Sequence, residues 1–163
     1  IAPPSLSARA IFVRDLTNIF ILISLIRSIM ITMKPKVSRG LLVEGEWIKK
    51  ILGRRKTWEI RSLPTHIRER IALIKTGSWT ILGTCRIVNC KVRTIKQLKR
   101  SFNKHQIAAD RLREFIKKRK KGYAWILASP NRLKNPIVLK RKKAAQKWVK
   151  LPSDISEKIE RQL

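Results

Sequence analysis

Three ionisable side chains lie within six residues of one another, directly after a glycine turn. The segment 53–61 reads Gly-Arg-Arg-Lys-Thr-Trp-Glu-Ile-Arg and contains Lys56, Glu59 and Arg61. Residues beside turns at strand ends are common positions for binding and catalytic groups. A lysine there can bind phosphate, or act in catalysis if burial lowers its pKa. Lys56 and Glu59 are therefore the candidate catalytic residues.

The spacing of this segment predicts which side chains share a face. On a strand over 57–61, Thr57, Glu59 and Arg61 point one way, while Trp58 and Ile60 point the other. We expect the apolar pair to enter the core and the polar set to face a cleft. Glu59 would then orient the Arg61 guanidinium toward a phosphate or a base edge. The alternative is a surface Glu–Arg pair beside a solvated lysine, which contributes little to stability.

Net charge is the most unusual property of the whole chain. Its 163 residues include 39 Lys and Arg against 10 Asp and Glu, for a formal charge of +29. Residues 1–33 hold three of these bases and one of the acids, so the excess belongs to 34–163. Self-repulsion of this size opposes folding, and its usual reason is a polyanionic partner. Nucleic acid comes first and an anionic membrane surface second, and a solvated basic face is the alternative.

The residues expected to contact nucleic acid combine the site segment with nearby turns and basic runs. Trp79 follows the turn at 77–78 and is the candidate for stacking on an unpaired base. The set is Arg54, Arg55, Lys56, Thr57, Glu59, Arg61, Arg68, Lys75, Ser78, Trp79, Lys140 and Arg141.

Several function classes lack their sequence signatures. No P-loop, GxSxG or HExxH motif is present. Cys85 and Cys90 form no CxxC pair, which indicates reduced thiols rather than a disulfide framework or zinc site. His66 and His105 lie far apart and are interpreted as surface or structural residues. We therefore predict no metal and no cofactor, and a cytoplasmic protein.

The first 33 residues differ from the rest. Residues 18–33 are strongly apolar but short for a membrane span, and Arg27 interrupts them. We interpret 1–33 as an N-terminal extension or non-native leader, with the biological start at Met30 or Met33. One alternative is a helix that packs on the domain. A weaker one is a membrane-surface segment.

The remaining pattern predicts short strands separated by turns, with helices inserted. Apolar residues at 47, 48, 51 and 52 give the expected helix at 46–52 one apolar face, and Gly53 follows it at the position of a C-cap. A glycine at 83 suggests a bulge or bend in its strand. We expect an α+β fold, a small β-barrel with flanking helices. The expected strands are 36–43, 57–61, 70–75, 80–91, 123–127 and 146–151; the expected helices are 46–52, 95–102, 108–118 and 154–162; a loop is expected at 131–139 around Pro136.

These motifs together resemble the ASCH domain family. The family pattern is Gly-x-Lys-x-x-Glu-x-Arg, and here Gly53 precedes Lys56 by one extra residue. The resemblance continues through 67–74, 77–78, 123–127 and 148–151 and covers about 40–152. The resemblance implies a PUA-like β-barrel with a cleft and an RNA-related function. We therefore divide the chain into the extension at 1–33, an ASCH domain at 34–152 and a C-terminal helix at 153–163.

Family members include RNA-associated coactivator domains, an N4-acetylcytidine amidohydrolase and a reported ribonuclease. In the amidohydrolase branch a threonine lies three residues after the lysine, but here Glu59 holds that position. Its distant glutamate has no clear counterpart, and Glu114 is the nearest candidate. We therefore predict an RNA-binding module, a monomer whose cleft accepts a base or nucleotide. The alternative is an enzyme that processes RNA or modified nucleosides.

Overall fold

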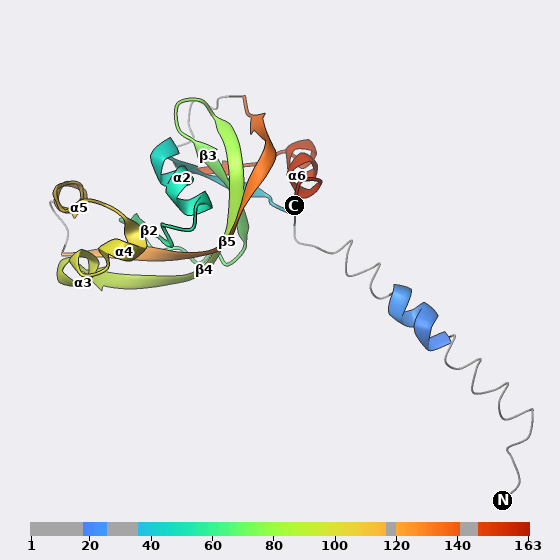
Figure 1. Ribbon diagram of the computed structural model, residues 1–163, viewed down its shortest axis with the longest axis horizontal. Coiled ribbons are helices and arrows are strands. Elements are labelled where there is room, and N and C mark those ends of the chain that lie inside the picture. The colour runs from blue at the N-terminus through green and yellow to red at the C-terminus, as the bar shows by residue number, and fades with distance from the viewer. Residues whose placement is uncertain (1–17, 26–35, 117–119, 141–146) are drawn as a thin grey trace, which may run out of the picture. The chain divides into compact units, whose positions relative to one another are not determined.

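The computed structural model of the protein describes residues 18–25, 36–116, 120–140 and 147–163 (Figure 1). It divides into two units, 1–35 and 36–163. In the first unit, residues 18–25 form a helix whose large apolar side chains are exposed. The expected start at Met30 or Met33 lies outside the described residues. Within the described ranges, no helix is both long and apolar enough to span a membrane.

The second unit is built on one six-stranded sheet. Its strand order is β2-β5-β4-β3-β1-β6. The pair β1–β3 is parallel and every other pair is antiparallel. The strands are β1 (Arg39–Val43), β2 (Trp58–Arg61), β3 (Arg70–Lys75), β4 (Thr80–Thr94), β5 (Lys121–Val138) and β6 (Trp148–Lys150).

The sheet does not close, so the predicted barrel is wrong on this point. Strands β2 and β6 are the two edges, and they do not pair with each other within the described ranges. Strand β1 already has a partner on each side, and β6 offers only three residues. A side chain links β2 to β1 instead of a strand pairing. Nη2 of Arg61 in β2 donates to the Leu42 carbonyl of β1 over 3.1 Å.

The two long strands carry the irregularities that shape the sheet. The register between β4 and β5 shifts three times, once between Ile81 and Gly83. A Cβ at Gly83 would lie 2.6 Å from the carbonyl oxygen of Asn131, so this close approach requires glycine. The predicted bulge is confirmed.

The predicted loop at 131–139 is wrong, because β5 continues to Val138. Pro136 has no N–H to give to a ladder, so it is tolerated only at an edge or a bulge. In this part of β5 the paired residues come from β4 alone, and the register shifts between Arg132 and Ile137. Pro136 therefore lies in a part of β5 that pairs on one side only and that also contains a register shift.

The helices sit where their apolar residues can meet the sheet. In α2, Ile48 and Ile51 are buried, and Gly53 follows as its C-cap, as predicted. Helices α3, α4 and α5 gather at one end of the β4–β5 ribbon, and α6 lies at the other (Figure 1). Their bounds are α2 (Gly45–Leu52), α3 (Ile95–Lys99), α4 (Phe102–His105), α5 (Ala109–Ile116) and α6 (Ser153–Glu160).

Three buried clusters hold these elements together. Trp58 and Ile60 enter one of them with Leu98 of α3 and Leu112 of α5, which confirms the predicted core face of β2. Because β2 and α5 share this core, the opposite face of β2 and the side of α5 are fixed with respect to each other. That arrangement sets the walls of the site.

Candidate functional site

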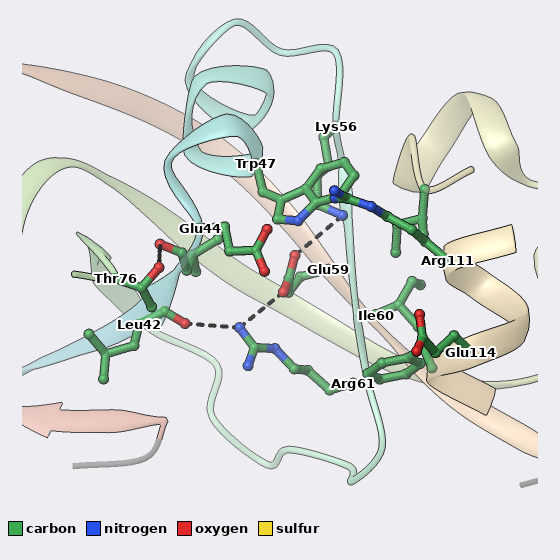
Figure 2. Close-up of a pocket in the computed structure, with 13 residues that line it drawn as sticks. Leu42, Glu44, Trp47, Lys56, Glu59, Ile60, Arg61, Thr76, Arg111 and Glu114 are labelled. Carbon is green, nitrogen blue, oxygen red and sulfur yellow. Dashed lines mark hydrogen bonds and ion pairs between the residues drawn. The ribbon is translucent and has the colours of Figure 1, made fainter. Parts of the chain in front are cut away.

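A cavity of about 520 Å³ lies between β2, the end of β1, α2 and α5 (Figure 2). We call it the main pocket. Arg111 and Glu114 project from α5 on one side, and Glu44 and Thr76 lie across from them (Figure 2). The lining residues are Leu42, Val43, Glu44, Trp47, Lys56, Glu59, Ile60, Arg61, Thr76, Ile107, Arg111, Glu114 and Phe115.

Lys56 is the most buried charged residue of the pocket. It follows the turn after α2, and 2% of the residue is exposed. Its Nζ donates to the His105 carbonyl over 2.8 Å and lies 3.3 Å from Oε2 of Glu59. The ammonium also stands 5.0 Å from the centre of the Trp47 ring. Burial lowers the pKa of Lys56, and the nearby Glu59 carboxylate opposes that shift.

Glu59 connects Lys56 to Arg61. Its other carboxylate oxygen, Oε1, lies 3.0 Å from an Nη2 nitrogen of Arg61 that also donates to the Leu42 carbonyl. Figure 2 shows the three charged side chains in one row that ends at this carbonyl. Charge-assisted hydrogen bonds of this kind are among the stronger ones in proteins. The row fixes the guanidinium at the pocket wall, where Nε of Arg61 is buried and has no hydrogen-bond partner in the described part of the chain.

His105 contacts this row through its backbone carbonyl, which accepts from Lys56. Its side chain is fully buried, Nε2 lies 2.8 Å from the Leu98 carbonyl, and Nδ1 accepts from the Ile107 amide over 3.0 Å. This pattern assigns the neutral tautomer with the proton on Nε2. Burial lowers the pKa of His105, and the Lys56 charge lowers it further while the Leu98 hydrogen bond opposes both. The interpretation of His105 as a structural residue is consistent with these bonds.

The main pocket offers both hydrogen-bond donors and acceptors. Arg61 and Arg111 supply donors, and Glu44 and Glu114 supply carboxylate acceptors. Trp47 and Phe115 add aromatic surface. Such a wall suits a flat polar ligand with mixed donors and acceptors better than a simple anion.

The structure brings together Lys56, Glu59 and Arg61 of the predicted site residues. Thr57 and Arg54 do not line the main pocket; with Lys56 they line a separate cavity of about 200 Å³, which we call the small cavity. Lys140 lines a third cavity beside α6. Arg141 lies outside the described residues. The remaining predicted residues are exposed and line none of these three cavities: Arg55, Arg68, Lys75 and Ser78.

Trp79 contradicts its predicted role as an exposed stacking residue. It is 7% exposed and belongs to the core cluster with Ile81 and Leu133. Its φ of 53° is in the left-handed region, which is uncommon for a residue other than glycine. Because it is buried in this cluster, Trp79 has no free face to offer a base.

Helix α5 supplies the residues that sequence reasoning missed. Arg111 and Phe115 lie about 50 residues after β2, and nothing in their local pattern placed them at the pocket. Arg111 also pairs with Glu46 of α2 over 3.1 Å. Glu114, the candidate for a distant glutamate, does line the pocket. Trp47 was assigned to the apolar face of α2, but part of it faces the ligand space.

A family model for the ASCH domain matches residues 41–137, and this match includes Lys56, Glu59 and Arg61. The chain belongs to the ASCH family. The match also covers most of the sheet, from the middle of β1 to the end of β5.

Solved ASCH structures from Zymomonas mobilis share the fold of this ASCH chain. The unsubstituted protein is 16% identical with a TM-score of 0.64, over 78% of this chain and 96% of its own. Two single-residue variants of it are 18% and 17% identical with TM-scores of 0.65 and 0.64. Each variant covers 77% of this chain, and 96% and 98% of its own length. No curated protein matches the chain.

Proposed function

We propose that this ASCH protein binds single-stranded RNA and places one base in the main pocket. The observation that carries the proposal is the buried row Lys56–Glu59–Arg61, which holds a guanidinium at the wall of a 520 Å³ cavity. Unpaired bases are recognised by hydrogen bonds to their edges and by stacking on aromatic or guanidinium planes. The pocket supplies both kinds of contact.

The carboxylates favour a base over a phosphate as the occupant. Glu44, Glu59 and Glu114 all line the main pocket. A phosphate would be repelled by them, whereas a base edge with N–H groups can donate to them. Trp47 and Phe115 are the aromatic candidates for stacking.

The net charge supports contacts to the phosphate backbone. The formal charge of +29 favours binding to any polyanion, and such binding weakens as salt rises. Charge alone therefore cannot separate specific RNA binding from nonspecific attraction. The contribution of the pocket must be tested separately.

Fluorescence anisotropy with a labelled single-stranded RNA tests the proposal. We expect Arg61→Gln to weaken binding by about tenfold, the value of one lost hydrogen-bonded contact to a base. The control is Arg132→Gln, an exposed arginine of β5 outside the main pocket. Equal affinities of the two variants would contradict a base in the pocket. If the unsubstituted protein binds no RNA, the whole proposal fails.

A second candidate function is hydrolysis of RNA or of a modified nucleoside. It is favoured by one observation, the buried Lys56 with its lowered pKa in the same pocket as Glu114. Incubation of RNA and of acetylated cytidine with the protein, followed by chromatography, tests it. Turnover that is lost in Lys56→Met would support hydrolysis. Unchanged substrates with the unsubstituted protein would exclude it for these two classes.

A further inference from the structure

The small cavity differs from the main pocket in the charges that line it. Arg54, Lys56 and Thr57 line the small cavity together with Ser129 and Pro130 of β5. Among the residues that the structure describes, no acidic one lines the small cavity, whereas three glutamates line the main pocket. Because Lys56 lines both, the two cavities are neighbours.

The small cavity is lined by two residues with unusual backbone geometry, one in the turn after α2 and one at a bulge of β5. Arg54 has a φ of 60° and Ser129 a φ of 47°, although neither is glycine. Such conformations cost free energy and cluster at functional sites. Two of the four non-glycine residues with positive φ in the described part of the chain therefore line this one cavity.

Arg70 hydrogen-bonds to the β5 bulge at Ser129. Its Nη1 donates to the Ser129 carbonyl over 3.1 Å and to the Thr84 hydroxyl over 3.0 Å. The register of β4 and β5 shifts between Thr84 and Arg86, so residues 129 and 130 bulge out of the ladder. Bulges near active sites re-aim side chains. The Ser129 side chain is exposed here.

We propose that the small cavity binds a phosphate group of the RNA strand whose base occupies the main pocket, an inference that rests on the proposed function. Arg54 supplies a guanidinium that pairs with no carboxylate among the described residues. Thr57 and Ser129 supply hydroxyl donors. The sequence predicted Thr57 beside Glu59 at the cleft, and its place in the small cavity gives it a different role.

The different charges of the two cavities should orient the bound nucleotide, with its base in the main pocket and its phosphate in the small cavity. In the main pocket three glutamates offset three cations, whereas the described lining of the small cavity includes Arg54 and Lys56 and no carboxylate, so we expect the phosphate in the small cavity. A nucleotide with its phosphate should therefore bind more tightly than the same nucleoside. Lys56, at the shared wall, is the residue that both parts of the ligand approach.

Binding of a short single-stranded RNA at several salt concentrations tests the inference. The variant is Arg54→Gln, which removes one exposed charge but keeps the side-chain length. The control is Arg132→Gln, which removes the same charge outside both cavities. We expect the slope of log affinity against log salt to become shallower by about 0.7 in Arg54→Gln, the value of one phosphate contact to a single strand. Arg132→Gln should change the slope much less.

A second measurement separates this inference from the proposed function. Isothermal titration compares adenosine, adenosine 3′-monophosphate, adenosine 5′-monophosphate and inorganic phosphate. We expect one of the monophosphates to bind at least about fivefold tighter than adenosine, and Arg54→Gln to remove that gain. The inference fails under the following combination of results. RNA binds, Arg54→Gln and Arg132→Gln have the same salt slope, and Arg54→Gln still prefers the monophosphate over adenosine as strongly as the unsubstituted protein does. The small cavity would then not be a phosphate site. If RNA does not bind the unsubstituted protein, the proposed function itself fails.

Discussion

The ammonium of Lys56 lies 3.3 Å from a carboxylate oxygen of Glu59, with both side chains at least nine-tenths buried. The pair joins the turn after α2 to the first edge strand, β2. Removal of one partner would leave the other charge buried with fewer partners, which is costly. Loss of either partner alone should therefore destabilise the fold, and the same residues line the main pocket.

Substitution of Lys56 should destabilise the protein far more than substitution of a surface lysine. We expect Lys56→Met to lower the free energy of unfolding by about 3 kcal/mol, because Glu59 keeps its charge but loses a buried partner. Lys36→Met is the control, since its pair with Glu157 has side chains 60% and 49% exposed and should contribute at most about 1 kcal/mol. Urea unfolding measures both. Equal losses would show that the Lys56–Glu59 pair has no special weight.

Lysine should not replace arginine at position 61. The Arg61 guanidinium contacts the Glu59 carboxylate and the Leu42 carbonyl. The ammonium of a lysine lacks the planar fork of donors that a guanidinium presents, so it cannot reproduce this geometry. We expect Arg61→Lys to cost about 2 kcal/mol of stability and to weaken RNA binding. Arg93→Lys, whose guanidinium lies 5.5 Å from the Trp58 ring, is the matched control. A tolerated Arg61→Lys would contradict the positioning role of Glu59.

Mild acid should destabilise the fold through His105. Its pKa is lowered in the folded protein, so the unfolded chain binds a proton more readily. Stability should therefore fall as the pH drops below the ordinary value of 6.5 and continue to fall down to the lowered folded pKa. Unfolding free energies between pH 7 and pH 5 measure the slope. His105→Gln should reduce the slope of unfolding free energy against pH. His66→Gln, a substitution at an exposed position, is the control and should not change this slope.

Trp79 and Trp47 should respond in opposite ways to truncation. Trp79→Ala removes a core ring, so we expect a loss of about 3 kcal/mol in stability and little change in RNA affinity per folded molecule. Trp47→Ala removes an aromatic wall of the main pocket and should weaken RNA binding by about tenfold. Urea unfolding and anisotropy on the same samples give both values. RNA binding that depends on Trp79 would revive its role as a stacking residue.

The sequence predicted local features of the fold well. The two-residue period of a strand placed Glu59 and Arg61 on one face and Trp58 and Ile60 in the core. The glycine at 53 marked the end of α2 because few other signals end a helix so clearly. These features depend on residues close together in the chain, so local chemistry is enough to predict them.

Features that depend on distant contacts were missed. Closure of the sheet depends on which strand lies beside β2, and the sequence contains no local sign that β1 already has two partners. Arg111 and Phe115 reach the pocket only because Leu112 of α5 packs into the core with Leu98. Trp79 was misplaced because it packs in a core cluster with Leu133 and Ile159, which are distant in the sequence.

An NMR titration of the isotope-labelled protein with a short single-stranded RNA tests most directly whether a base enters the main pocket. We expect saturable shifts of the Trp47 indole N–H and of the amides of Glu59, Arg61 and Arg111, which all line the pocket. Equal amounts of a polyanion without bases, such as polyphosphate, should leave the Trp47 indole signal in place. Shifts confined to exposed lysines and arginines, or identical shifts with polyphosphate, would contradict a base-binding pocket and leave only nonspecific attraction by charge.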